Sequence, residues 1–435
     1  LDTARTAAVL PGARIVVSEG RAFPVETRHL GDAAPTARLE DRVAKAVLRA
    51  TADDAGDLLV FLPGLAEIRR VKAALESDLA DDRFALLMLH GDLPLAEQDL
   101  ALRADPRGRR KIVLATSIAE TSLTIDGIRV VIDAGLKRLP RFDPVSGMTR
   151  LETVKVSLAA ADQRRGRAGR TAPGICYRLW SAATERAMTP YDAPEILAAD
   201  LAPFALELGV WGTTDAAALA LLDAPPEAHL RQARDLLQRL GALDAEGRAT
   251  AHGKAMAELG THPRLAHMML KAKEQERGAL AADLAALLSE RDLVREGRSD
   301  ADLRHRVDLL REGGGGDRGA RERIRRSADA WRKQLGTGNA ARDRDAVGAV
   351  TALAYPDRIA QKRGGAGQYR LANGKGAKLD AADPLAREDW LAVAALDGDR
   401  REARIFLAAP LSRAGIDEDF ADQIVEQESV AWNAR

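Results

Sequence analysis

The segment IVLATSIAETSLTIDGIRVVIDAG, residues 112–135, decides the predicted fold. Its first apolar run, residues 111–115, predicts a buried strand that ends at Thr116 and Ser117. A polar loop through Asp126 then leads to a second apolar run at residues 130–132. Two hydroxyls would therefore stand at the carboxyl end of a strand, and open α/β sheets bind their ligands at that edge. The segment predicts a parallel sheet with a ligand-binding loop.

Strands and helices alternate on both sides of this segment. The predicted strands cover residues 58–62, 84–89, 111–115, 130–133 and 175–180, and the predicted helices cover residues 66–79 and 94–103, with a further helix opening near Ala160. Residues 139–156 are predicted to form a hairpin. Such alternation is typical of a parallel sheet that is covered by helices on both faces.

The segment QRRGRAGR, residues 163–170, carries four arginines around two glycines. A guanidinium is permanently charged and presents two donors side by side to a phosphate, and glycine lets a backbone approach a ligand closely. The pattern therefore suits the stabilisation of charge on a transferring phosphoryl group. Composition alone favours a solvated, basic start of a helix. The segment at residues 112–135, about forty residues upstream, supports the phosphate interpretation instead.

Helices replace strands after residue 181. Amphipathic helices are predicted at residues 196–208 and 229–240, a short wing at 241–250, and further helices between 266 and 309. Residues 313–316 are four glycines and predict a flexible connector, and residues 318–333 carry seven basic and two acidic side chains. That basic stretch is compatible with a solvated helix face or with a surface that faces nucleic acid. From residue 347 a helix is followed by strand-like pieces with glycine turns.

The bulk composition excludes several classes of protein. The 435 residues include 65 basic and 65 acidic side chains, so the net charge does not attract nucleic acid and any such binding must come from local patches. Cys176 is the only cysteine, which excludes an internal disulfide and a cysteine-based zinc site. The single cysteine also fits a reducing cytoplasm. No apolar stretch approaches 18 residues, so no membrane contact is expected. No metal site is expected, because His262 and His267 are five residues apart and would lie on different helix faces.

Together these segments resemble the DEAH group of superfamily 2 RNA helicases. Residues 115–127 resemble motif V of that group, residues 163–170 motif VI, and residues 57–64 motif IV, while residues 18–25, 354–360 and 371–377 resemble bacterial members. The resemblance implies a multidomain α/β plus α chain. Its first part would be the end of a first RecA-like domain with a linker (1–20) and a second RecA-like domain (21–185). A winged helix (186–255), a ratchet-like helical bundle (256–345) and a truncated OB-like domain (346–435) would follow. By the same resemblance the chain begins just after motif III of a longer protein.

The resemblance also implies roles for individual residues. It assigns Arg167 and Arg170 as arginine fingers, Gln163 as the residue that orients the attacking water, Thr124 and Asp126 as nucleotide contacts, and Gly91, Thr116 and Ser117 as contacts to the nucleic-acid backbone. Asp92 stands where the family usually has serine or threonine, so its carboxylate is expected to point away from the strand. Residues 138–150 match the hairpin that separates strands, with an ordinary sheet-edge hairpin as the alternative.

The expected activity is ATP-dependent movement along single-stranded or structured RNA, with ATP and Mg²⁺ as cofactors and the protein as a monomer. The chain contains neither a glycine-rich loop ending in Gly-Lys-Ser/Thr nor an Asp-Glu-Ala-His sequence, the parts that hold the phosphates and magnesium. We therefore predict that the chain alone does not hydrolyse ATP. Two alternatives stay open: a nucleic-acid-binding scaffold without enzymatic activity that derives from a helicase, and a DNA-directed helicase.

Overall fold

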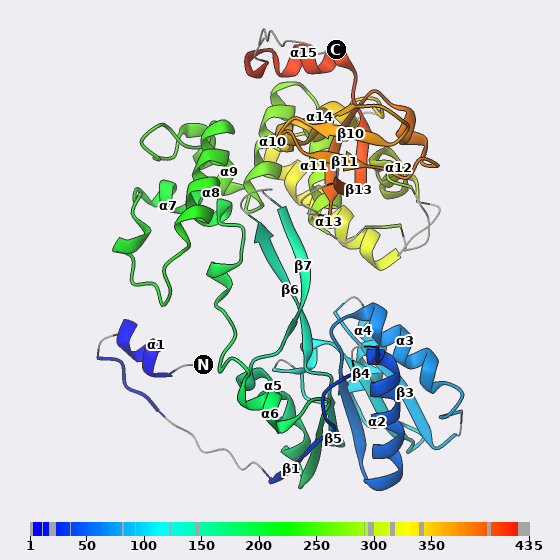
Figure 1. Ribbon diagram of the computed structural model, residues 1–435. Coiled ribbons are helices and arrows are strands. Elements are labelled where there is room, and N and C mark those ends of the chain that lie inside the picture. Colours follow the sequence, from blue (N-terminus) through cyan, green and yellow to red (C-terminus); the bar gives the residue numbers. More distant parts are fainter. Residues whose placement is uncertain are drawn as a thin grey trace, which may run out of the picture. The chain divides into compact units, whose positions relative to one another are not determined.

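The computed structural model describes residues 3–10, 12–16, 23–34, 36–80, 82–91, 93–121, 123–143, 148–290, 292–294, 300–313, 318–338, 343–397 and 402–424. The chain divides into two compact units (Figure 1). Unit 1 comprises Leu1–Arg141 and Leu151–Ala198, and unit 2 comprises Phe142–Arg150 and Ala199–Arg435. The finer division into five domains stays a prediction.

Unit 1 is built on a six-stranded sheet with the order β1-β8-β5-β2-β4-β3. Every neighbouring pair is parallel, and the strands are β1 (Val25–His29), β2 (Asp57–Phe61), β3 (Phe84–Leu89), β4 (Arg110–Ala115), β5 (Ile128–Asp133) and β8 (Gly174–Arg178). The sequence predictions for the last five strands are confirmed, with bounds that differ by at most two residues. The alternation of apolar strands and helices therefore produced the expected RecA-like parallel sheet.

Helices cover both faces of this sheet because alternate strand residues point to opposite sides. Leu58 and Val60 of β2 pack with α2 (Leu39–Asp53) and α3 (Leu65–Leu75) on one face. Leu59 and Phe61 of the same strand pack on the other face, where α4 (Leu95–Leu102), α5 (Leu158–Gly166) and the 3₁₀ helix η2 (Arg167–Gly169) lie. The remaining helices of unit 1 are α1 (Thr3–Val9) and α6 (Ala182–Arg186).

Strands β6 (Leu136–Asp143) and β7 (Met148–Lys155) form a separate two-stranded sheet, which confirms the predicted hairpin. Two ion pairs anchor its base: Lys137 pairs with Asp192, and Arg138 Nη2 lies 3.2 Å from Glu67 Oε1. A Cβ on Gly64 would lie 2.7 Å from Arg138 Nη1, so a larger residue there would displace the guanidinium. The separation of strands by this hairpin stays a prediction.

Unit 2 begins with helices α7 (Ala202–Trp211), α8 (Glu227–Arg239) and α9 (Ala251–Glu258). The predicted helix at residues 196–208 is confirmed from Ala202 onward, but its predicted start is wrong, because α7 begins only at Ala202. Pro203 lacks an N–H donor and fits the first turn of a helix but not its interior. Asp200 Oδ1 accepts from the Ala202 N–H at 2.9 Å and holds that first turn. Within the predicted wing, Leu243 and Ala249 form an isolated antiparallel bridge.

A helical bundle and a small barrel complete unit 2 (Figure 1). The helices are α10 (Pro263–Glu274), α11 (Gly278–Ser289), α12 (Leu303–Glu312), α13 (Arg318–Leu335) and α14 (Val347–Ala354). The closed barrel has the order β10-β11-β13-β12-β9, with β9 (Ile359–Lys362), β10 (Gln368–Leu371), β11 (Gly376–Lys378), β12 (Trp390–Leu396) and β13 (Glu402–Pro410), and α15 (Arg413–Asp419) follows it. The five-stranded closed barrel agrees with the expected OB-like part.

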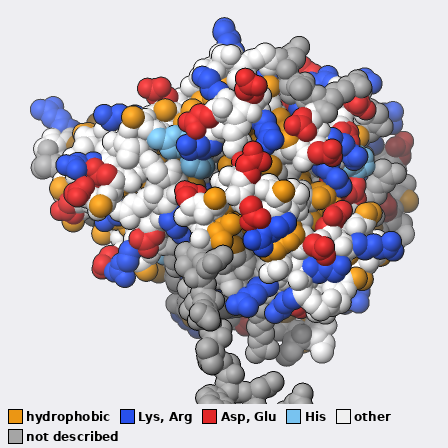
Figure 2. All heavy atoms as spheres, turned by 90° about the horizontal axis from the view of Figure 1, so that it is seen from above, with side chains coloured by type: hydrophobic (Ala, Val, Ile, Leu, Met, Phe, Trp, Pro, Cys, Tyr) orange, Lys and Arg blue, Asp and Glu red, His pale blue; other side chains and the backbone are white. Residues whose placement is uncertain are grey.

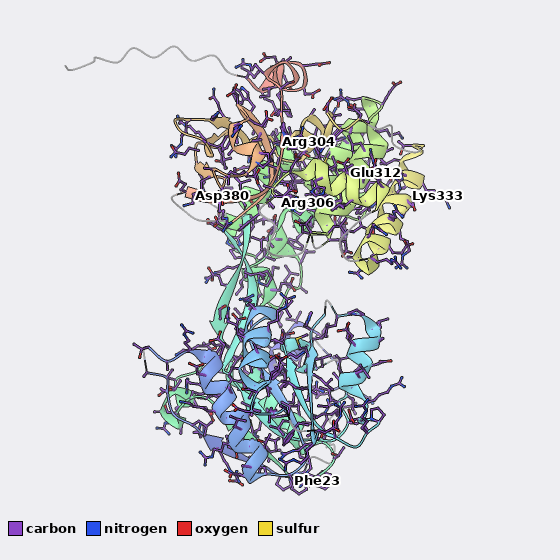
Figure 3. All side chains as sticks on the ribbon, turned by 90° about the vertical axis from the view of Figure 1, so that its right-hand side faces the viewer. Phe23, Arg304, Arg306, Glu312, Lys333 and Asp380 are labelled. Carbon is purple, nitrogen blue, oxygen red and sulfur yellow. The ribbon has the colours of Figure 1, made fainter. Side chains whose placement is uncertain are left out.

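Two arginines of the basic helix α13 make contacts within unit 2. Arg332 Nη1 lies 2.7 Å from the buried Asp283, and Arg325 Nε donates to the Leu310 carbonyl at 2.9 Å. Lys333 is exposed at the edge of unit 2 (Figure 3). The predicted basic surface is therefore smaller than the sequence count suggests. On the face drawn in Figure 2, acidic and basic side chains are interspersed, which agrees with the zero net charge.

His262 and His267, which the sequence predicted on different helix faces, have separate partners. His262 Nε2 lies 3.1 Å from Asp200 Oδ2, whereas His267 Nδ1 lies 2.9 Å from His252 Nε2. Burial, with the neighbouring His252 and Lys271, lowers the pKa of His267 to about 3. The structure therefore holds the His252–His267 pair in a neutral form.

This histidine pair predicts acid sensitivity of unit 2. An unfolded histidine has a pKa of about 6.5, so below that pH the unfolded chain binds a proton that His267 in the folded protein does not bind. The free energy of unfolding therefore decreases as the pH falls from about 6.5 towards 3. Between pH 7 and pH 4.5, His267 alone should cost about 2 kcal/mol. Hydrogen exchange of the α10 amides would measure this slope. The variant H267Q should flatten it and the control H29Q, in unit 1, should not; an unchanged slope in H267Q would contradict the assignment.

Candidate functional site

The residues assigned to nucleic acid lie at the carboxyl edge of the sheet of unit 1. Gly91 follows β3, and Thr116 and Ser117 follow β4. The Thr116 N–H donates to the Leu89 carbonyl at 3.3 Å, and a Cβ on Gly91 would lie 4.0 Å from Ile118 Cδ1. The structure thus brings the three residues together, with Gly91 and Ser117 exposed. Asp92 lies outside the described residues.

The loop after β4 then crosses to the opposite edge of the sheet. The Asp126 N–H donates to the Leu102 carbonyl at 3.0 Å, and the Gly127 carbonyl accepts from the N–H of Asp57, the first residue of β2. Gly127 has a φ of +83°, and a Cβ there would lie 2.5 Å from Asp57 Oδ2, so glycine is required. Asp126 is exposed at this amino edge. Asp126, assigned to the nucleotide by resemblance, therefore lies at the opposite edge of the sheet from the residues assigned to nucleic acid.

Three arginines of the stretch 163–170 recur every third residue. Helix α5 begins at a Ser157 cap, whose Oγ accepts from the Ala160 N–H, and it continues into η2. Residues three apart lie on the same side of a helix, so Arg164, Arg167 and Arg170 face one way. All three contact the loop that carries Thr124, and each reaches a different point of that loop.

Arg164 is wholly buried and makes an ion cluster. Its Nε donates to Glu120 Oε1 at 2.7 Å, its Nη1 donates to Asp133 Oδ1 at 2.7 Å, and its guanidinium lies 4.9 Å from the centre of the Phe61 ring. Burial by itself would lower the pKa of Arg164, but the charges of Asp133 and Glu120 hold it above its usual value. The side chain therefore stays charged, and its donors bind groups inside the protein.

Arg167 is 5% exposed and is held by two backbone carbonyls. Its Nε donates to the Glu120 carbonyl at 2.8 Å and its Nη1 to the Leu123 carbonyl at 2.5 Å. Its Nη2 is buried and has no hydrogen-bond partner within the part of the chain that the structure describes. Burial, together with the positive charge of Arg170, lowers the pKa of Arg167 to about 10. A buried cation with a free donor is suited to an anion, which would satisfy the donor and the charge together.

Arg170 and Gln163 differ from Arg167 in exposure. Arg170 is exposed, and its Nη1 donates to Thr124 Oγ1 at 3.1 Å. Gln163 is exposed on α5, without the burial that holds Arg167 in place. The structure therefore gathers Arg167, Arg170 and Thr124 around one loop. Such a group can bind a phosphate and stabilise charge on it.

Sequence reasoning missed two functional neighbours, Glu120 and Asp133. Both carboxylates are buried or nearly so, with side-chain exposures of 14% and 0%. A buried carboxylate needs a positive partner, and the regular spacing of three arginines was the signal that could have pointed to them. No group of three His, Cys, Asp or Glu residues within the described ranges is arranged to hold a metal ion.

Comparisons with known proteins agree with this geometry. Residues 41–172 match the family model "Helicase conserved C-terminal domain". The chain is 42% identical to the ATP-dependent RNA helicase HrpB of Escherichia coli over 100% of this chain and 52% of HrpB. It is 34% identical to the ATP-dependent RNA helicase HrpA of the same organism over 63% of this chain and 22% of HrpA. Probable ATP-dependent RNA helicase DHX34 of Mus musculus is 35% identical over 64% of this chain and 25% of that protein.

Two solved structures share the fold. A crystal structure of the E. coli DExH-box NTPase HrpB matches with a TM-score of 0.83 and 40% identity over 97% of this chain and 50% of that chain. A second crystal structure, of the E. coli DEAH/RHA helicase HrpB, matches with a TM-score of 0.84 over 95% of this chain and 51% of that chain. The chain spans about half the length of HrpB. By its C-terminal helicase domain, its likeness to HrpB along its whole length and its motif V and VI geometry, the chain belongs to the HrpB-like group of DEAH-type helicases.

Proposed function

We propose that this chain forms the second motor half and the accessory domains of an ATP-dependent RNA helicase. The observation that carries the proposal is the buried Arg167, whose Nη2 lacks a partner among the described residues and lies in a helicase motif next to Arg170. An arginine finger of this kind stabilises the charge that develops on the transferring phosphoryl group. Arg167 and Arg170 would contact the β- and γ-phosphates, Gln163 would orient the attacking water, and Thr124 and Asp126 would contact the rest of the nucleotide.

The residues present fit the phosphates of ATP but not its magnesium ion. Two guanidiniums and a hydroxyl are donors to phosphate oxygens, whereas the described residues offer no cluster of carboxylates for a divalent cation. When bound, ATP with Mg²⁺ would supply the phosphoryl group that is transferred to water. We place the phosphate loop and the magnesium ligands in a preceding RecA-like domain of the complete protein.

The rest of the chain suits a role in holding RNA. Gly91, Thr116 and Ser117 would contact the RNA backbone at the carboxyl edge, where hydroxyls and a backbone N–H bind phosphate without reading a base. The hairpin β6–β7 would separate strands, and the winged helix would act mainly as a connector. Within the described residues, no helix has the length and apolar character to cross a membrane. We expect a cytoplasmic monomer.

Measurements of ATP hydrolysis test this proposal. We expect the complete protein to release phosphate from ATP, with greater stimulation by single-stranded RNA than by single-stranded DNA of the same sequence. A complete protein that binds RNA but releases no phosphate would support a non-enzymatic scaffold, and equal or greater stimulation by DNA would support a DNA-directed helicase.

The chain by itself should release phosphate no faster than a blank without protein. The arginine fingers contribute on the order of three to five decades of rate, but only to a nucleotide that is already held by a phosphate loop and magnesium. Turnover by these 435 residues well above the blank would contradict the division of the site between two domains.

A further inference from the structure

Among the contacts that join the arginine stretch to the loop after β4, those of Arg164 and Arg167 meet at one residue, Glu120. Its side-chain carboxylate accepts from Arg164 Nε at 2.7 Å, and its main-chain carbonyl accepts from Arg167 Nε at 2.8 Å. Arginines from two consecutive turns of the α5–η2 segment therefore bind the side chain and the main chain of the same residue. Arg164 and Arg167 both depend on where Glu120 lies.

The buried end of this arrangement is rigid. Arg164 is wholly buried and is held by Asp133 at the end of β5, whose Oδ1 also accepts from the Gly135 N–H at 2.8 Å. The Arg164 guanidinium donates in addition to the Leu136 carbonyl at 3.3 Å. Separating a buried ion pair has a high free-energy cost, because each charge would be left without water and without its partner. The sheet thus fixes Arg164, and Arg164 fixes the Glu120 side chain.

The other end of the arrangement carries the proposed finger. No carboxylate of the described residues accepts a hydrogen bond from Arg167; its Nε and Nη1 are oriented by the carbonyls of Glu120 and Leu123. Its remaining nitrogen, Nη2, is the one with no partner among the described residues. The direction of that nitrogen therefore follows from the position of the Glu120 backbone.

We infer that Glu120 is a positioning residue for Arg167: its carboxylate, locked by Arg164 and Asp133, holds the Glu120 carbonyl where it aims the free Nη2 of Arg167 at the phosphate. This inference rests on the proposed function and adds a residue to it that does not touch the nucleotide. A guanidinium displaced by about an ångström loses much of its effect on a transition state, which can cost on the order of a hundredfold in rate. Nucleotide binding, which uses other contacts as well, is affected much less.

The test is the variant E120Q in the complete protein, with RNA-stimulated ATP hydrolysis as the readout. Glutamine keeps the size and an acceptor oxygen but removes the charge that locks Arg164. We expect kcat to fall by about tenfold while KM for ATP stays within about twofold. The matched control is E40Q, because Glu40 is 17% exposed against 14% for Glu120, pairs with Arg70 in the same unit and has no contact with the arginine stretch. E40Q should retain the kcat of the wild type.

A double-mutant cycle separates positioning from a general structural effect. If Glu120 acts through Arg167, then E120Q/R167A should turn over no more slowly than R167A alone. A structural role would instead lower the rate by the same factor in both backgrounds, which would contradict the inference. If E120Q fails to fold, E120D is measured in the same cycle, since it keeps the charge but withdraws it by one methylene.

The outcomes also distinguish this inference from the proposed function. A complete wild-type protein without RNA-stimulated hydrolysis contradicts the proposed function and the inference with it. An active wild type whose E120Q variant has an unchanged kcat contradicts the inference alone. A tenfold loss that disappears in the R167A background supports both.

Discussion

Replacement of Arg167 by alanine in the complete protein should reduce RNA-stimulated ATP turnover by about a thousandfold or more. The variant removes a cation that stabilises the transition state from across the nucleotide cleft, a contribution that reaches three to five decades in related phosphoryl-transfer enzymes. The fold should survive, because the lost hydrogen bonds to two loop carbonyls contribute about 1 kcal/mol each. Steady-state kinetics with saturating RNA, together with hydrogen exchange on the same sample, would measure both effects.

The matched control for this prediction is R165A. Arg165 belongs to the same stretch but is half-buried on another side of α5, where its Nε lies 3.6 Å from Asp162. The R165A variant should keep its turnover within about threefold of the wild type, as expected for a partly exposed ion pair of small energetic value. An R167A protein with the turnover of R165A would remove Arg167 from the mechanism.

Replacement of Arg164 by methionine should have the opposite effect, a loss of fold. Methionine fills much of the same volume, but Asp133 then loses its charged partner in a site with no solvent exposure. Breaking a buried ion pair by removing one partner costs about 3–5 kcal/mol. Hydrogen exchange of the β5 amides in this chain should therefore report a free energy of opening lowered by that amount.

A second variant identifies the stranded carboxylate as the cause of this loss. In R164M/D133N the uncompensated charge is gone, so the double variant should be more stable than R164M although it carries one more change. R165M, at a position that makes only a surface contact, should lie within about 0.5 kcal/mol of the wild type. If R164M were as stable as R165M, the cluster would not anchor the loop.

These two predictions show how far sequence reasoning reached. The stretch 163–170 predicted phosphate chemistry, but its arginines share one chemistry and one local pattern. Whether a guanidinium is structural or functional depends on its partners, and those partners lie 31 and 44 residues away along the chain at Asp133 and Glu120. The early start predicted for the helix at residues 196–208 has a local cause, since the apolar periodicity continued across Pro203 although a proline limits where a helix begins.

The parallel sheet, the hairpin, the helical second half and the motifs could be predicted from local sequence, because apolar periodicity and turn residues act over a few neighbouring positions. The difference between the structural and the functional arginines depends on tertiary contacts. The fold buries Arg164 against Asp133 and Glu120, leaves Nη2 of Arg167 without a partner among the described residues, and exposes Arg170 beside Thr124. The physical reason is that the energy of a charge depends on its distance to other charges and to water, and folding sets both distances by bringing together residues that are remote in sequence.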